Sequence, residues 1–161
     1  MESPKPKKVV TNLSVRPSIE SDCEYLAHNL RRADHNEVKA AMGVVSPEAL
    51  LFSMRNTQEP LTIVDDDTPA GIFGVAPIEP HVGAIWLLGT DALVHGKWRF
   101  LRQSKKWLAH VSQDYERLFN YVDERNYLHI RWIAWLGFSF IFRHEKYGVE
   151  QRPFLEFVRI V

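Results

Sequence analysis

One stretch near the C-terminus decides the fold, and it reads Arg125-Asn126-Tyr127-Leu128-His129-Ile130-Arg131-Trp132-Ile133-Ala134-Trp135-Leu136-Gly137-Phe138. Asn is a residue type that often precedes the first turn of a helix, and Gly is one that often follows the last turn. The apolar residues between them predict an amphipathic helix over about residues 126–136. A run of aromatic and aliphatic residues at 118–122 comes just before it and predicts a strand. The stretch therefore predicts a strand–helix unit.

The rest of the chain continues this alternation of strands and helices. Ser21 and Glu24 have the spacing of a capping box, which predicts a first helix that runs through Ala33. Pro47 predicts the start of a second helix, and the apolar spacing predicts a long helix over 97–114. Short apolar runs predict the remaining strands, at residues 13–16, 61–64, 70–76, 82–88, 138–143 and 154–161. Strands on both sides of single helices imply one mixed sheet with right-handed crossovers.

Length and composition favour a single domain. The chain has 161 residues, of which 45% are hydrophobic, so it can bury a sizeable core. We expect residues 1–12 to form a flexible lead-in and residues 13–161 to form the domain. Lys+Arg and Asp+Glu both number 20, so no global field favours nucleic acid or an anionic membrane. Cys23 is the single cysteine, and no apolar run reaches the roughly 20 residues of a membrane span, so we expect a cytoplasmic protein.

The strand–helix unit over residues 118–138 resembles the last such unit of the GCN5-related N-acetyltransferases, the GNAT superfamily. The predicted order of elements from residue 13 onward is similar to that family as well. The resemblance implies an α/β fold, in which a mixed sheet of six to seven strands is flanked by about four helices and the parallel fourth and fifth strands are splayed. It also implies that acetyl-CoA binds between those two strands and that an amine attacks its thioester directly.

The resemblance implies a set of cofactor-binding residues. In the family, backbone N–H groups and the helix dipole at the start of the long helix hold the pyrophosphate of coenzyme A. The matching window is residues 93–98, where Gly96 matches a family glycine and Trp98 stands where a small residue is usual. Lys97, Arg99 and Arg102 are cations near the start of a helix, where positive charge is unfavourable, and a bound phosphate would relieve this. Acidic side chains or solvent would relieve it equally well. Asn126 matches the residue that contacts the pantetheine arm, and it would also serve as an N-cap. The implied cofactor-binding residues are Leu88, Gly89, His95, Gly96, Lys97, Trp98, Arg99 and Asn126.

The family's usual acid, a Tyr on the last helix, is replaced here by Ile133. His129, about one turn upstream, is a candidate in its place, and the alternative is a buried, hydrogen-bonded structural side chain. Glu79 and Asp91 are candidates for the base that deprotonates the amine, with His81 as a third. Alternatively, Glu79 and His81 belong to a surface connection between two prolines and have no catalytic role. Asp91 would then serve only as a cap of the following segment. No ligand spacing in the sequence indicates a metal site.

Four strings resemble a narrower group, the GNAT-like proteins of tailed bacteriophages, which includes internal virion proteins. They are Trp86-Leu87-Leu88-Gly89-Thr90-Asp91, Leu118-Phe119-Asn120-Tyr121-Val122, His129-Ile130-Arg131-Trp132 and Arg152-Pro153-Phe154-Leu155-Glu156-Phe157. This resemblance implies a phage origin, action in the host cytoplasm on a host or phage target, and association with the virion as a further option.

The sequence leaves the function open between three hypotheses. The first is an N-acyltransferase whose acceptor amine belongs to a protein or a small molecule. The second is a GNAT scaffold of impaired activity that serves protein binding or virion assembly. The third is a binder of another adenine nucleotide or anion. A homodimer is compatible with each, because zero net charge and exposed aromatic residues favour self-association.

Overall fold

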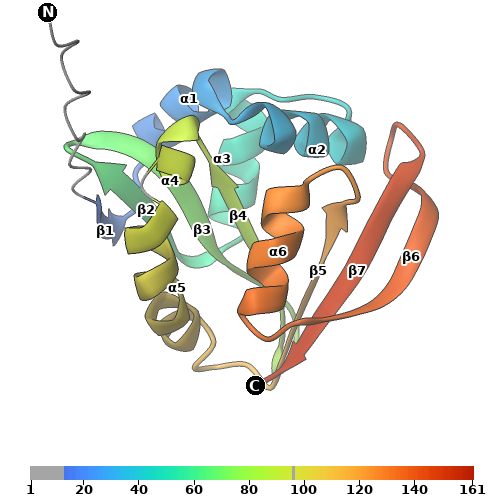
Figure 1. Ribbon diagram of the computed structural model, residues 1–161. Coiled ribbons are helices and arrows are strands. Elements are labelled where there is room, and N and C mark those ends of the chain that lie inside the picture. The colour runs from blue at the N-terminus through green and yellow to red at the C-terminus, as the bar shows by residue number, and fades with distance from the viewer. Residues whose placement is uncertain (1–12, 96) are drawn as a thin grey trace, which may run out of the picture.

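A computed structural model describes residues 13–95 and 97–161 (Figure 1). Seven strands form one sheet in the order β1-β2-β3-β4-β5-β7-β6. Their bounds are β1 Leu13–Pro17, β2 Gln58–Asp65, β3 Thr68–Glu79, β4 Val82–Gly89, β5 Arg117–Asp123, β6 Ser139–Tyr147 and β7 Arg152–Ile160. All neighbours are antiparallel except β4 and β5, which are parallel. The predicted mixed sheet is therefore confirmed.

Six helices in the described part of the chain cover the two faces of the sheet (Figure 1). They are α1 Glu20–Asn29, α2 Arg32–Met42, α3 Pro47–Arg55, α4 Asp91–His95, α5 Lys97–Val111 and α6 Tyr127–Trp135. Ile72 and Leu88 face α1, α2 and α3 in one core cluster. Their neighbours Phe73 and Leu87 face α4 and α5 on the other side. This alternation is the period-2 pattern of a strand buried on both faces.

The prediction of one helix from Ser21 through Ala33 is wrong. The structure has two helices there, because α1 ends at Asn29 and α2 begins at Arg32. The buried residues of α2 are Asp34, Val38 and Ala40, so a carboxylate interrupts the apolar period by which a helix is recognised. Together with the short α4, this raises the number of helices above the four that we expected.

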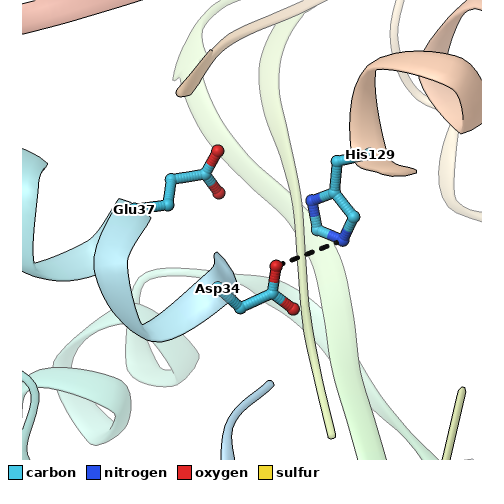
Figure 2. Close-up of side chains that lie close together, drawn as sticks. All are labelled: Asp34, Glu37 and His129. Carbon is cyan, nitrogen blue, oxygen red and sulfur yellow. Dashed lines mark ion pairs between the residues drawn. The ribbon is translucent and has the colours of Figure 1, made fainter. Parts of the chain in front are cut away.

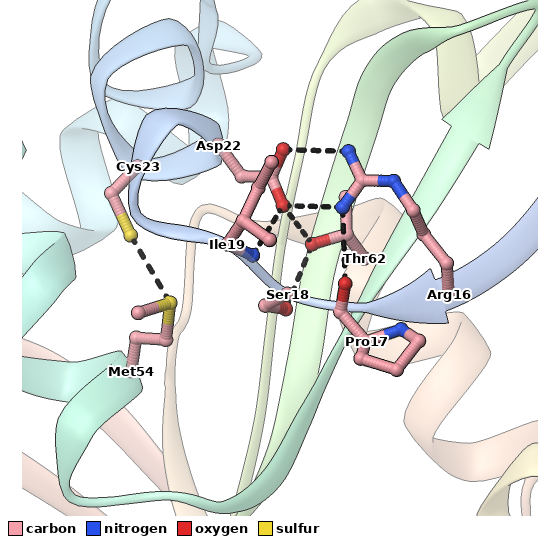
Figure 3. Close-up of polar contacts among 8 residues, drawn as sticks. All are labelled: Arg16, Pro17, Ser18, Ile19, Asp22, Cys23, Met54 and Thr62. Atoms are coloured by element: carbon pink, nitrogen blue, oxygen red, sulfur yellow. Dashed lines mark hydrogen bonds and ion pairs between the residues drawn. The ribbon is translucent and has the colours of Figure 1, made fainter.

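The predicted capping box of Ser21 is also wrong, because the helix begins two residues earlier and its N-cap is Ile19. Ile19 precedes the first turn of α1, and its N–H donates to the side chain of Asp22 over 2.9 Å. The two terminal nitrogens of Arg16 each donate to Asp22 over 2.8 Å, and the hydroxyl of Thr62 donates to it over 2.8 Å (Figure 3). Asp22 therefore joins β1, β2 and the start of α1.

β4 and β5 separate after a short paired segment. Their register runs from Val82 opposite Arg117 to Ala84 opposite Phe119 and ends there. The side-chain Nδ2 of Asn120 then donates to the carbonyl of Ile85 over 2.7 Å, where the next backbone bond of the ladder would lie. Beyond this point residues 85–89 and 120–123 border an opening in the sheet. The predicted splay of the fourth and fifth strands is therefore confirmed.

The turn between β6 and β7 holds α2 near that opening. The N–H groups of Val149 and Glu150 donate to carbonyls at the end of α2. Gly148 makes this approach possible, because its φ is +68° and a Cβ there would lie 2.6 Å from the carbonyl oxygen of Ala40. The contact places the side chains of α2 over the ends of β4 and β5.

Two predicted features lie outside the described residues, namely the lead-in at residues 1–12 and Gly96. Among the helices of the described ranges, none combines the length and the apolar character needed to span a membrane.

Candidate active site

A cleft lies where β4 and β5 separate, on the side of the sheet that carries α5 and α6. Leu87 of β4, Tyr121 of β5, Phe100 of α5 and Trp132 of α6 are among its walls. Most of the lining is apolar, and the cavity measures about 80 Å³. A cavity of this size has room for a small group such as an acyl carbonyl, because one ordered water needs only about 10–15 Å³ on the same measure.

Two of the polar side chains that line this cleft come from elements on opposite sides of it. Glu37 comes from α2 and His129 comes from α6, and both line the cavity. Figure 2 shows the carboxyl group of Glu37 and the ring of His129 directed toward each other. Asp34 completes the group, with 3.5 Å between its Oδ1 and Nε2 of His129. One ligand atom from each of the three residues lies within 4.8 Å of the other two.

Asp34 is fully buried and has several donors around its carboxylate. Arg31 donates to its Oδ1 over 2.9 Å, and the N–H of Gly89 donates to its Oδ2 over 2.8 Å. Asn126 donates to Oδ1 over 3.0 Å, and the carbonyl of this amide accepts from Arg31 over 2.7 Å. This network orients Asp34 beside His129 and links α2 to the end of β4 and the start of α6.

Glu37 has fewer donors and more negative neighbours. Its Oε1 accepts from the N–H of Asp123 over 2.7 Å. Burial, together with the nearby carboxylates of Asp34 and Asp123, raises the pKa of Glu37 to about 8. At neutral pH the side chain therefore carries its proton in most molecules and can act as a donor.

His129 has the opposite shift. Burial lowers the pKa of His129, the cation of Arg31 lowers it further, and Asp34 only partly opposes this. The ring is therefore neutral at neutral pH. A buried neutral His and a half-buried protonated Glu face one cavity, and this arrangement suits proton transfer.

Asp34, Glu37 and His129 also have the ligand types of a divalent metal site. Arg31 argues against that use, because its guanidinium already pairs with the Asp34 oxygen that is nearest to His129. A metal ion would have to displace this pairing and lie close to a cation. The geometry therefore favours proton chemistry over metal binding.

The window 93–98 differs from an open phosphate loop. Residues 91–95 form the short helix α4, and His95 is exposed at its end. Leu93 is buried and packs in the core with Leu87 and Phe73. The side chains of Lys97 and Trp98 and the whole of Gly96 lie outside the described residues, while Arg99 is exposed on the first turn of α5. The N-terminal end of α5 and Arg99 thus remain as the candidate anion-binding elements.

Two other predicted cofactor residues already have partners. Asn126 is buried, both ends of its amide are bonded within the Asp34 network, and it makes no side-chain cap to α6. Gly89 donates to Asp34 and accepts from the N–H of Arg31. The side chain of Leu88 faces α1 and α3. The backbone of Leu87 faces the opening instead, because strand groups alternate and both Ile85 O and Gly89 N–H point there.

The predicted catalytic residues separate in space. His129 lies in the cleft. Glu79 is exposed and pairs with Val82, at the opposite end of β4 from Gly89, roughly 20 Å away. His81 is exposed in the same turn, and Asp91 is exposed at the start of α4. The structure brings none of these three into the cleft beside His129.

Asp34 and Glu37 were missed by sequence reasoning. Their spacing of three puts both on one face of a helix, but this signal is common on solvated helices. They become recognisable only when their helix is placed against β5 and α6.

Three solved structures illustrate what the fold is similar to. Ard1 from Thermoplasma volcanium matches with a TM-score of 0.71 and 15% identity, covering 92% of this chain and 97% of that one. The structure of yncA from Salmonella typhimurium, which contains its cofactor acetyl-CoA, matches with a TM-score of 0.70 and 13% identity, covering 92% and 93%. The ribosomal-protein-S5-alanine acetyltransferase from Vibrio fischeri matches with a TM-score of 0.63 and 19% identity, covering 94% and 96%.

At the level of sequence, neither a protein-family model nor a curated protein matches the chain. The similarity therefore concerns the path of the backbone. The seven-stranded sheet, the parallel splayed pair and nearly complete coverage agree with those neighbours. The chain has the fold of the GNAT acetyltransferases.

Proposed function

We propose that this chain is an acetyl-CoA-dependent N-acyltransferase, in which an amine attacks the thioester directly. The observation that carries the proposal is the separation of β4 and β5 into an apolar cleft that is lined by the half-buried Glu37 and the buried His129. A thioester and an amine need both features, because the reaction requires a site that excludes water and groups that move protons.

The residues of the cleft fit the thioester end of coenzyme A. Trp132 Nε1 is buried and has no hydrogen-bond partner within the described residues, so an acceptor atom of a bound ligand would satisfy it. The backbone of Leu87 offers an N–H toward the opening, where it could stabilise the negative charge that develops on the attacked carbonyl. The phosphates of coenzyme A would be attracted by the first turn of α5, by Arg99 within it and by Arg102 in the next turn.

We further propose that the protein is of phage origin and acts in the cytoplasm of the infected bacterium. The support is the resemblance of the four sequence strings to phage GNAT-like proteins. The acceptor would be an amine of a host or phage protein, or of a small molecule.

A second candidate function is a GNAT scaffold used for protein binding or virion assembly. The observation in its favour is β6, which forms one edge of the sheet and exposes Phe140, Ile141 and Phe142. An exposed apolar edge strand is a template for pairing with another chain, including a second copy in a homodimer. This surface lies apart from the cleft, so both functions can exist in one protein.

Acetyl-CoA titration by calorimetry tests the proposal. Gln103 of α5 is exposed at the lining of the cleft, and Gln103→Trp should obstruct it without disturbing the core. We expect the parent protein to bind acetyl-CoA and Gln103→Trp to bind at least about tenfold more weakly. Lys106→Trp is the matched control, because Lys106 is exposed on the same helix and does not line the cleft. A parent protein that binds no acetyl-CoA would rule out the transferase and leave the scaffold.

A further inference from the structure

We propose that Glu37 and His129 are the acid–base pair of the site, with His129 accepting a proton from the acceptor amine and Glu37 donating one to the leaving thiolate. The proposal rests on the proposed function. It assigns a catalytic role to Glu37, on α2, and to His129, four residues before Ile133 on α6.

Glu37 and His129 lie close enough together to act on the same reacting carbon. Both line the same cavity as Leu87, and their side chains approach it from α2 and α6. The amine nitrogen loses a proton and the thioester sulfur gains one, and during the reaction both atoms are bonded to the same carbonyl carbon. The acid and the base must therefore lie within a few ångströms of each other, and here their atoms are within 4.8 Å.

The surroundings of the two groups favour a protonated Glu37 and a neutral His129. Glu37 faces Asp34 of its own helix, Asp123 of β5, Arg125 of the following loop and Tyr147 of β6. The negative charges of Asp34 and Asp123 favour the neutral acid at position 37. His129 faces Asp34 and Arg31, whose charges oppose each other, and its burial favours the neutral ring. A protonated acid and a neutral base are therefore present together before the reaction.

The two groups together account for every proton that moves in the reaction. The neutral amine nitrogen forms a bond to the carbonyl carbon, and the carbon–sulfur bond breaks with its electron pair on sulfur. One amine proton passes to His129, and the carboxyl proton of Glu37 passes to sulfur. The site is then left with a charged His and a charged Glu side by side. A proton moves from the imidazolium to the carboxylate, directly or through one water, and restores the starting state.

Asp34 is a positioning residue in this scheme. It contacts His129 at 3.5 Å and is held by Arg31, Asn126 and the N–H of Gly89. This arrangement directs Nε2 of the ring toward Asp34, and Figure 2 shows the other ring nitrogen on the side of Glu37, where it can accept a proton.

The test is the pH dependence of thiol release from acetyl-CoA, with an aniline as the acceptor because its amine stays uncharged over the assayed range. We expect kcat/KM of the parent protein to fall above about pH 8, as Glu37 loses its proton. Glu37→Gln should lower the rate by about 10²–10⁴-fold and remove this alkaline limb. His129→Gln should lower it by a similar factor, and Glu48→Gln, an exposed acid on α3, should change neither rate nor profile.

The outcomes separate this inference from the proposed function. Acetyl-CoA binding by calorimetry and urea unfolding establish that each variant is folded and loaded. If Glu37→Gln binds acetyl-CoA and keeps both the parental rate and the alkaline limb, the inference is wrong while the function stands. If the parent binds acetyl-CoA but releases no thiol, Glu37 has no step to serve and the inference is again overturned. If the parent binds no acetyl-CoA, both the proposed function and this inference are wrong.

Discussion

Asp22 and Glu37 are acids on neighbouring helices of the same face of the sheet, and their surroundings drive their ionisation in opposite directions. Asp22 accepts from both terminal nitrogens of Arg16, the N–H of Ile19 and the hydroxyl of Thr62 (Figure 3). Burial alone would raise the pKa of Asp22, but these hydrogen bonds and the charge of Arg16 hold it below its usual value. Glu37 lies beside two other carboxylates, and its pKa is raised to about 8.

The comparison shows how donors decide the role of a buried acid. A carboxylate whose oxygens are matched by donors is stabilised in its charged form and holds elements together. A carboxyl group that is buried beside like charges keeps its proton and stays reactive near neutral pH. Asp22 therefore serves the fold, whereas Glu37 has the properties of a catalytic group.

The largest expected effect on stability comes from removing the charge of Asp22. Asp22→Asn should lower the free energy of unfolding by about 2–3 kcal/mol, because hydrogen bonds to a charged group contribute about 1.5–3 kcal/mol and Arg16 remains partly hydrated. Urea unfolding would measure this. Glu20→Gln on the same helix removes only an exposed ion pair with Arg55, and its effect should stay within about 0.5 kcal/mol. Equal effects of the two variants would contradict the structural role of Asp22.

A second effect on stability is expected from pH, and its sign follows from the raised pKa of Glu37. The folded state binds this proton more tightly than the unfolded state, so the stabilisation is complete in acid and is lost as pH rises toward about 8. The free energy of unfolding should fall between about pH 5 and pH 8, by at most about 1.4 kcal/mol per pH unit, and Glu37→Gln should remove this slope. Urea midpoints at several pH values would measure it.

The same measurement in acid sharpens the contrast between the two sites. The lowered pKa of Asp22 stabilises the fold above the pKa of the unfolded chain, and this contribution is lost as pH falls. The free energy of unfolding of the parent protein should therefore fall in acid as Asp22 is protonated. Asp22→Asn should not show this fall. If Glu37→Gln kept the decrease of the free energy of unfolding between about pH 5 and pH 8, a group other than Glu37 would be its cause.

The smallest effect is expected from removing one donor of the Asp22 network. Thr62 is buried, and Thr62→Val keeps the shape of the side chain while it deletes the hydroxyl that donates to Asp22. We expect a loss of about 1 kcal/mol, since Arg16 and Ile19 still compensate the carboxylate. Urea unfolding of the single and double variants with Asp22→Asn would measure the coupling. Additive losses would show that Thr62 acts independently of Asp22.

Sequence reasoning located the fold better than the site. The strand at 118–122 and the helix near 126–136 are visible because apolar spacing and end residues are local signals, and both exist as β5 and α6. His129 was a candidate because it lies within that unit. Asp34 and Glu37 escaped notice because α2 buries carboxylates on its inward face, and such a helix has no apolar stripe to recognise.

Asn126 illustrates why a matching motif position does not establish a role. Its place at the start of α6 was predicted, but its amide bonds to Arg31 and Asp34, which are 95 and 92 residues away in the chain. No local pattern reports such partners. The same holds for Glu37, which meets the N–H of Asp123 across 86 residues.

The sequence by itself determined most of the order of strands and helices, because propensity, turn residues and apolar period act over a few residues, whereas the splayed parallel pair was an implication of the family resemblance. Only the tertiary structure decided which ionisable groups share a dry environment. That outcome depends on packing α2 against the ends of β4 and β5 and against α6, which sets the dielectric surroundings and the neighbouring charges of Glu37 and His129.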